Sequence, residues 1–269
     1  RLKTGRYPDV SEEFKQYQDK VSFQKARLFG VPSYQRYVRS VVNRRAQKRM
    51  EEKKEKARSV ILKNVVEETL PDDTLQARVL GRFLLQSLKT NGPTSVQGVL
   101  SYYRQLPHSE PMMERLDGYL QRWSRIAEGQ PAPGFSYPSF SGDTVSLESL
   151  KGSYVYIDAW ATWCKPCIKE IPYLKTLQDA YERDEVRFVS ISLDDAADRG
   201  KWRRLVETRD LQGLQLFAGG EAFDADFARD YLINSIPRFI LIGPDGRVVD
   251  PKAQRPSGNI QVRLDKLLS

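Results

Sequence analysis

The stretch "DAWATWCKPCIKEIP" (Asp158–Pro172) holds both cysteines of this 269-residue sequence, Cys164 and Cys167. A lysine and a proline separate them, and Trp163 stands directly before the first. Such a pair has three roles open to it: a structural disulfide, half of a metal site, or a redox-active dithiol. The sequence on either side narrows the choice.

Apolar residues on both sides of the pair predict a strand followed by a helix. The run "SYVYIDAW" (153–160) is nearly continuous and rich in β-branched and aromatic residues, which is typical of a central strand covered on both faces. After the cysteines, apolar residues from Ile168 to Tyr181 recur at helical spacing. The pair therefore lies between a strand and a helix, where α/β sheets place their chemistry.

The alternation of strand and helix continues to the end of the chain. Two more apolar runs, "VRFVSISL" and "RFILIG", read as strands, and a "GPDG" turn leads into the short strand "RVVD". The expected strands are thus 186–193, 238–243 and 247–250, and the expected helices 196–208, 222–232 and 258–268. Strands that alternate with helices predict an α/β sheet.

The first half of the chain is built differently. Residues 1–130 carry a net charge of +10, whereas residues 131–269 carry −2. Apolar residues of the first half recur at helical spacing in three runs, 32–70, 75–88 and 113–127. Prolines and glycines then interrupt any helical pattern at 128–143. We therefore predict an all-α N-terminal domain, 1–130, followed by an α/β domain, 131–269.

The charge and the apolar runs also bear on location and partners. No run approaches the roughly 20 apolar residues of a membrane-spanning helix. The sequence begins with Arg1 rather than methionine, which suggests a processed or trimmed product. A signal peptide or lipid anchor removed during processing would be consistent with this start.

Segment 21–58 has 12 basic and 3 acidic residues. We expect a solvated helix face there, with an anionic membrane surface or an acidic partner as the alternative. Nucleic-acid binding is not expected, because no base-reading or stacking element accompanies the charge.

Two of the three roles for the cysteine pair conflict with the rest of the sequence. A disulfide stabilises mainly by closing a long loop in the unfolded chain, and a gap of two residues is near the minimum. A structural zinc site needs four ligands, usually Cys or His, and the one histidine, His108, is 56 residues before Cys164. We therefore expect no metal at this site.

A redox role uses every residue of the motif. Cys164, at a helix N-terminus, would face unpaired amides and the positive end of the helix dipole, which favour the thiolate. Lys165 adds a nearby positive charge, and Pro166 falls in the first helical turn, where its missing N–H is harmless. Cys167, one turn further on and expected to be less accessible, can attack a mixed disulfide formed at Cys164.

Three further positions complete a recognisable pattern. Asp158 stands six positions before Cys164 in an apolar strand, and Pro172 stands eight positions after it in the helix. The Ile236–Pro237 step directly precedes a strand. Together these positions resemble the thioredoxin fold, a central mixed sheet flanked by helices. The segment "APGFSYPSFSGDTVSLESLKGSYVYIDAWATWCKPC" resembles more narrowly the TlpA/ResA-like thiol–disulfide oxidoreductases of bacterial cell envelopes. These proteins are related to the redoxin and AhpC/TSA groups. The resemblance covers roughly 131–269.

The resemblance implies an extracytoplasmic thiol–disulfide oxidoreductase of the periplasm or cell envelope, and it favours reduction over oxidation. It implies no cofactor beyond the redox-active Cys164–Cys167 disulfide and a helical insertion within 194–235. The partners would be disulfide-containing or dithiol proteins, or small thiols, and an upstream electron donor. A peroxiredoxin is excluded, because Ile157 and Ala161 stand where a peroxidatic site has proline and threonine or serine.

The same resemblance gives expected roles to the residues around the pair. Asp158, buried beneath the active-site turn, should have a raised pKa and accept the proton of Cys167, directly or through a water. The Ile236–Pro237 peptide bond is expected to be cis, with its loop beside Cys164 and free to pair with a substrate strand. The expected substrate contacts are Trp163, Lys165, Pro166, Ile236 and Pro237.

A binding or scaffold protein is the opposing hypothesis. It would keep the thioredoxin fold and use the basic helical domain to hold a partner. Disulfide reduction that depends on Cys164 would separate an enzyme from such a scaffold.

Overall fold

The computed structural model describes residues 30–53, 58–107, 110–181 and 185–269. Contacts divide the chain into two compact units, Arg1–Gly118 and Tyr119–Ser269. His108 and parts of the basic segment, 21–29 and 54–57, lie outside the described residues. None of the described helices is both long enough and apolar enough to cross a membrane.

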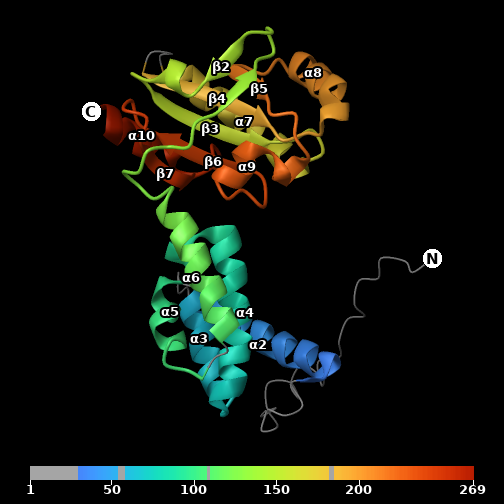
Figure 1. The fold of residues 1–269 in the computed structure, drawn as a ribbon, viewed down its shortest axis with the longest axis vertical. Helices are drawn as coiled ribbons and strands as arrows, with labels where there is room; N and C mark the ends of the chain where they lie inside the picture. Colours follow the sequence, from blue (N-terminus) through green and yellow to red (C-terminus); the bar gives the residue numbers. More distant parts are fainter. Residues whose placement is uncertain (1–29, 54–57, 108–109, 182–184) are drawn as a thin grey trace, which may run out of the picture. The chain divides into compact units, whose positions relative to one another are not determined.

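Every described secondary-structure element of the first unit is a helix, as its apolar spacing predicts (Figure 1). Its helices are α2 (Pro32–Lys53), α3 (Arg58–Thr69), α4 (Asp73–Asn91), α5 (Gln97–Tyr103) and the first part of α6 (Glu110–Ser124). The predicted helical run 32–70 contains helices α2 and α3. Asp72 caps α4 by accepting a hydrogen bond from the Leu75 N–H at 2.8 Å. Gly92, at φ 78°, ends the same helix in a conformation that favours glycine.

Buried apolar side chains on neighbouring helices form the core of this unit. They recur every three or four residues along α2, α3 and α4, so each helix turns one stripe inward. The fully buried members are Val38, Val41, Ile61, Val66, Leu75, Leu80, Leu84 and Leu88.

The second unit is built on a five-stranded mixed sheet with the order β5-β4-β3-β6-β7 (Figure 1). Its strands are β3 (Tyr154–Trp160), β4 (Val186–Ser192), β5 (Leu214–Phe217), β6 (Arg238–Ile242) and β7 (Val248–Ala253). Strands β3, β4 and β5 are parallel, whereas β6 and β7 each run antiparallel to their neighbour. The predicted strands at 153–160, 186–193 and 238–243 are therefore confirmed, and β5 is a strand that the sequence analysis missed.

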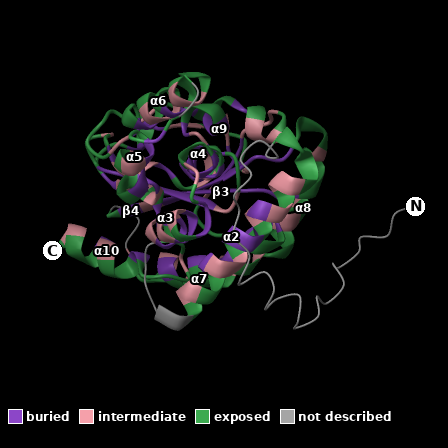
Figure 2. Ribbon diagram, turned by 90° about the horizontal axis from the view of Figure 1, so that it is seen from below, coloured by how far each residue is buried: buried purple, intermediate pink, exposed green. Residues whose placement is uncertain are grey.

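Helices cover both faces of this sheet, which explains why its central strands read as apolar runs. Helices α7 (Lys165–Asp179) and α10 (Ile260–Leu268) pack on the face that carries Tyr156 and Phe239. Helix α9 (Asp226–Asp230) packs on the opposite face. Strand β3 is buried along nearly its whole length, whereas α8 (Arg199–Thr208) keeps an exposed side (Figure 2).

The proline- and glycine-rich stretch 128–143 is part of this unit rather than a free connection. It contains β1 (Ser136–Pro138), which pairs with β2 (Thr144–Ser146) in an antiparallel hairpin. Gly142, at φ 103°, lies in the turn between them. The Phe140 N–H donates to the Gln215 carbonyl oxygen at 2.8 Å and joins the hairpin to β5. The prolines and glycines therefore serve turns and short edge pairings.

Candidate active site

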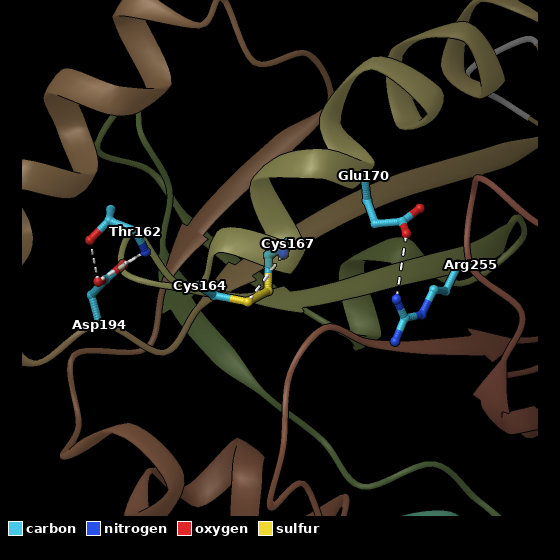
Figure 3. The surroundings of a disulfide bond; sticks show 6 residues. All are labelled: Thr162, Cys164, Cys167, Glu170, Asp194 and Arg255. Carbon is cyan, nitrogen blue, oxygen red and sulfur yellow. Dashed lines mark hydrogen bonds and ion pairs between the residues drawn. A yellow bond between two sulfur atoms is a disulfide. The ribbon is translucent and has the colours of Figure 1, made fainter. Parts of the chain in front are cut away.

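Cys164 and Cys167 form a disulfide with an S–S distance of 2.01 Å and a Cα–Cα distance of 5.3 Å (Figure 3). Cys164 is the N-cap of α7, and its sulfur accepts a hydrogen bond from the Cys167 N–H at 3.2 Å. Pro166 lies in the first turn, where a helix tolerates proline. In the described part of the chain, no group of three or more Cys, His, Asp or Glu side chains is placed to hold a metal ion.

Cys164 and Cys167 are almost equally buried in this disulfide form. Cys164 is 4% exposed and Cys167 is 3% exposed. Both sulfurs belong to a buried cluster with Trp160 and Trp202, and Ile236 packs against that cluster. In the disulfide form, the same buried cluster therefore covers both cysteines.

The residues predicted to contact substrate lie around this buried pair. The Ile236–Pro237 peptide bond is cis. Lys165 and Pro166 are exposed at the start of α7. Trp163 is 51% exposed, and its ring meets that of Phe223 edge-on, with centroids 6.2 Å apart. Phe223 comes from the segment 194–235, and no spacing signal in the sequence links it to the cysteines.

Asp158 lies in the middle of β3, between Ser190 of β4 and Phe239 of β6. Its Oδ1 atom is buried and has no hydrogen-bond partner among the described residues. Burial raises the pKa of this carboxyl from 3.8 to about 8, and the negative charge of Glu170 adds to the effect. A small cavity of about 10 Å³ is lined by both Asp158 and Cys167. Asp158 and the second cysteine therefore line the same small cavity.

Glu170 is a buried acidic residue that the sequence analysis missed. It lies on α7 one turn after Cys167, a spacing that puts both on one side of the helix. Its carboxylate accepts hydrogen bonds from the Ser257 N–H at 3.1 Å and the Ser257 hydroxyl at 3.0 Å. Arg255 approaches it to 3.7 Å (Figure 3). These contacts fix a second negative charge near Asp158.

Asp194 holds the turn that presents Cys164, and it too was missed. It is fully buried just after β4. Its carboxylate accepts hydrogen bonds from the Thr162 N–H at 3.0 Å and from the Thr162 hydroxyl at 2.6 Å (Figure 3). The Ser192 hydroxyl donates to the same carboxylate at 2.7 Å. Hydrogen bonds to a charged acceptor are stronger than those between neutral groups. The three short hydrogen bonds to the Asp194 carboxylate therefore fix the turn.

The Asp194→Ala variant should unfold more readily than the wild type. It would leave the Thr162 N–H and two hydroxyls without their acceptor, at a cost of about 2–4 kcal/mol in the free energy of unfolding. Denaturant unfolding followed by tryptophan fluorescence measures this change. The control is Asp195→Ala at the exposed neighbouring position, which should change stability by less than about 0.5 kcal/mol. Equal losses in the two variants would contradict the assigned role.

Comparisons with known proteins place the second unit among thiol–disulfide oxidoreductases. The sequence profile of the AhpC/TSA family matches residues 128–250. The thiol–disulfide oxidoreductase ResA of Bacillus cereus is 28% identical over 152 residues, which are 56% of this chain and 84% of ResA. The thioredoxin-like protein YneN of Bacillus subtilis is 33% identical over 133 residues, which are 49% of this chain and 75% of YneN.

Solved structures of related proteins also align with this chain. The thioredoxin domain of a thiol–disulfide oxidoreductase from Bacteroides vulgatus aligns at 28% identity and a TM-score of 0.48 over 54% of this chain and 99% of that domain. YneN is the relative that shows the family, because this chain covers three quarters of YneN at 33% identity. Residues 128–250, which the AhpC/TSA profile matches, contain the cysteine pair at the start of α7. The chain therefore belongs to the TlpA/ResA-like family of thiol–disulfide oxidoreductases.

Proposed function

We propose that this protein is an extracytoplasmic reductant that transfers electrons from the Cys164–Cys167 dithiol to disulfides of protein or small-thiol substrates. The observation that carries the proposal is the disulfide at the N-terminus of α7. A sulfur at that position faces the free amides of the first helical turn, which stabilise a thiolate. The reductive direction and the extracytoplasmic location rest on the resemblance to TlpA/ResA-like proteins.

The reaction proceeds in two exchange steps. The Cys164 thiolate attacks one sulfur of the substrate disulfide, which forms a mixed disulfide and releases the other substrate sulfur as a thiolate. The Cys167 thiol then loses its proton, and the thiolate attacks the Cys164 sulfur. The Cys164–Cys167 bond forms, and the remaining substrate sulfur leaves with the electron pair. The substrate gains two electrons, and the enzyme dithiol loses two.

Other side chains of the site support these two steps. Asp158 accepts the proton of Cys167, since burial brings its pKa close to neutral. Trp163, Lys165 and Pro166 offer an exposed surface to the substrate, and the loop of Ile236–Pro237 offers backbone groups for pairing.

The proposal also covers the partners. The electrons reside in the cysteine pair, so the reaction needs no bound cofactor, and an upstream dithiol donor must restore the reduced state. For the basic segment 21–58, association with anionic membrane lipids or an acidic partner remains the alternative to a solvated helix face. Fractionation of cells that make the native protein tests the location, and its recovery with cytoplasmic enzymes would contradict it.

A disulfide-reduction assay tests the proposed activity. The purified protein should accelerate reduction of a standard protein disulfide by dithiothreitol, because Cys164 supplies a better nucleophile than the free reagent. The Cys164→Ser variant should react no faster than dithiothreitol alone. If the wild type is also no faster than Cys164→Ser, the scaffold hypothesis is favoured.

The direction of electron flow has its own measurement. Titration of the Cys164–Cys167 pair in glutathione buffers should give a potential close to the reducing end of the range for such pairs, about −270 to −120 mV. A value near −120 mV would instead make the protein an oxidant.

A further inference from the structure

A row of polar side chains crosses three neighbouring strands beneath α7. Asp158 of β3 pairs in register with Ser190 of β4, and Ser190 pairs in register with Gln215 of β5. Residues in register on neighbouring strands point to the same face of a sheet. Two residues earlier along each strand, the same face carries Tyr156 and Phe188. Their rings meet edge-on in the apolar core. The row is thus a polar line in an apolar face.

Three polar atoms at this row are buried without a hydrogen-bond partner among the described residues. They are Asp158 Oδ1, Gln215 Oε1 and Trp160 Nε1. All three residues line the same cavity of about 10 Å³, and so does Cys167. Buried polar atoms nearly always have a partner, so three unpartnered atoms on residues that line one cavity point to something that fills it.

The cavity has the size and the polarity for one water molecule. A volume of about 10 Å³ is close to the smallest that holds a water, which then needs two to four polar partners. The Trp160 indole N–H can donate to the water, and Asp158 Oδ1 and Gln215 Oε1 can each accept one of its hydrogens. The second lone pair of the water can accept a hydrogen bond from the Cys167 thiol.

The orientation of the Gln215 amide is fixed by a separate contact. Its Nε2 donates to the Gln212 carbonyl oxygen at 2.7 Å, and a carbonyl accepts only from the nitrogen side of an amide. The oxygen of Gln215 is therefore the atom left without a partner. This fixes Gln215 as an acceptor at the cavity.

We propose that Trp160 and Gln215 hold one water molecule that links Asp158 to the Cys167 sulfur. The inference rests on the proposed function for its catalytic consequence. In the second exchange step, the water takes the Cys167 proton and passes one of its own to Asp158 Oδ1, so the water is restored. Gln215 Oε1 accepts a hydrogen bond from one hydrogen of the water. This contact keeps the second hydrogen of the water directed at the Asp158 carboxylate. Trp160 and Gln215 are thus positioning residues for resolution of the mixed disulfide.

The water itself can be detected in the wild-type protein. A nuclear Overhauser cross-peak between the water resonance and the Trp160 indole N–H should be present, with Trp160→Phe used to assign the peak. Because this measurement needs no catalysis, it tests the water site even if the proposed activity fails. Absence of the cross-peak would overturn the inference.

The kinetic test compares two glutamines that donate to the same carbonyl oxygen. Gln178 also lines the cavity and its Nε2 donates to the Gln212 oxygen at 3.3 Å, but Gln178 has no polar atom that is buried without a partner and so nothing to hold the water. In full-length protein, Gln215→Met should slow decay of a preformed Cys164 mixed disulfide by about tenfold at pH 7, the factor that one hydrogen bond of roughly 1.4 kcal/mol is worth. Gln178→Met should decay at the wild-type rate.

The pH profile separates this role from a loss of stability. The rate in the wild type should rise as Asp158 ionises, and the amplitude of that rise should fall in Gln215→Met. A uniform slowing at every pH from 6 to 9, or no slowing, would overturn the positioning role. If the wild type reduces disulfides but Gln215→Met matches it, the proposed function stands and only this inference fails.

Discussion

Cys167→Ser should stop the reaction after its first covalent step and accumulate a mixed disulfide between Cys164 and the substrate. A serine hydroxyl cannot displace a thiolate from a disulfide, so release of the substrate should slow by more than about a thousandfold. Mass spectrometry of the reduced variant after exposure to a small disulfide should show one adduct per chain. Dithiothreitol should remove that adduct.

The reciprocal variant supplies the control for this result. Cys164→Ser keeps Cys167, which lies inside the first turn of α7 rather than at its N-cap. Fewer free amides face a sulfur at that position, so the thiolate is less favoured and the adduct should form more slowly. Since both cysteines are equally buried in the disulfide form, exposure does not decide which one reacts first. Faster adduct formation in Cys164→Ser would reverse the assigned order.

Asp158→Asn should stabilise the oxidised protein, increasingly so as the pH rises. In the unfolded chain this carboxyl loses its proton near pH 3.8, whereas burial in the folded protein raises its pKa to about 8. Between these values the folded state binds the extra proton, so the free energy of unfolding of the wild type falls as the pH rises. Each pH unit within the window contributes up to about 1.4 kcal/mol, and asparagine removes the dependence.

Unfolding at two pH values measures this effect. All four tryptophans (Trp123, Trp160, Trp163 and Trp202) lie after residue 118, so their fluorescence follows the unit that contains Asp158. Asp158→Asn should exceed the wild type by roughly 5 kcal/mol at pH 7.5 and by only about 1 kcal/mol at pH 4.5. The exposed Asp195→Asn is the control and should track the wild type at both values. A gain independent of pH would point to packing rather than to a buried charge.

The same variant should lose activity as it gains stability. Without the carboxylate, the Cys167 proton loses its proposed final acceptor, and resolution at neutral pH should slow by about a hundredfold. The first attack by Cys164 should change much less. Stopped-flow decay of a preformed mixed disulfide compares the two proteins, and equal rates from pH 6 to 9 would reduce Asp158 to a structural residue.

Local patterns in the sequence were sufficient for much of the fold. The apolar run 153–160 is strand β3, and the helical spacing after Cys167 is α7. Strand β5 was missed because it has only four residues and follows a loop, so its apolar run is too short to signal a strand. The stretch 128–143 was read as a boundary because proline and glycine mark turns whether or not the turns belong to a domain.

The sequence by itself determined which residues do the redox chemistry, because Cys164 and Cys167 are close along the chain and one helix start is enough to place them. The tertiary structure alone decided what surrounds them. Gln215 and Asp158 line one cavity through the register of three strands, and Glu170 meets Ser257 across 87 residues. Such contacts depend on pairing and packing between distant segments, whose spacing along the chain carries no period. A local pattern can therefore place the two sulfurs, but only the folded sheet shows the cavity beside them.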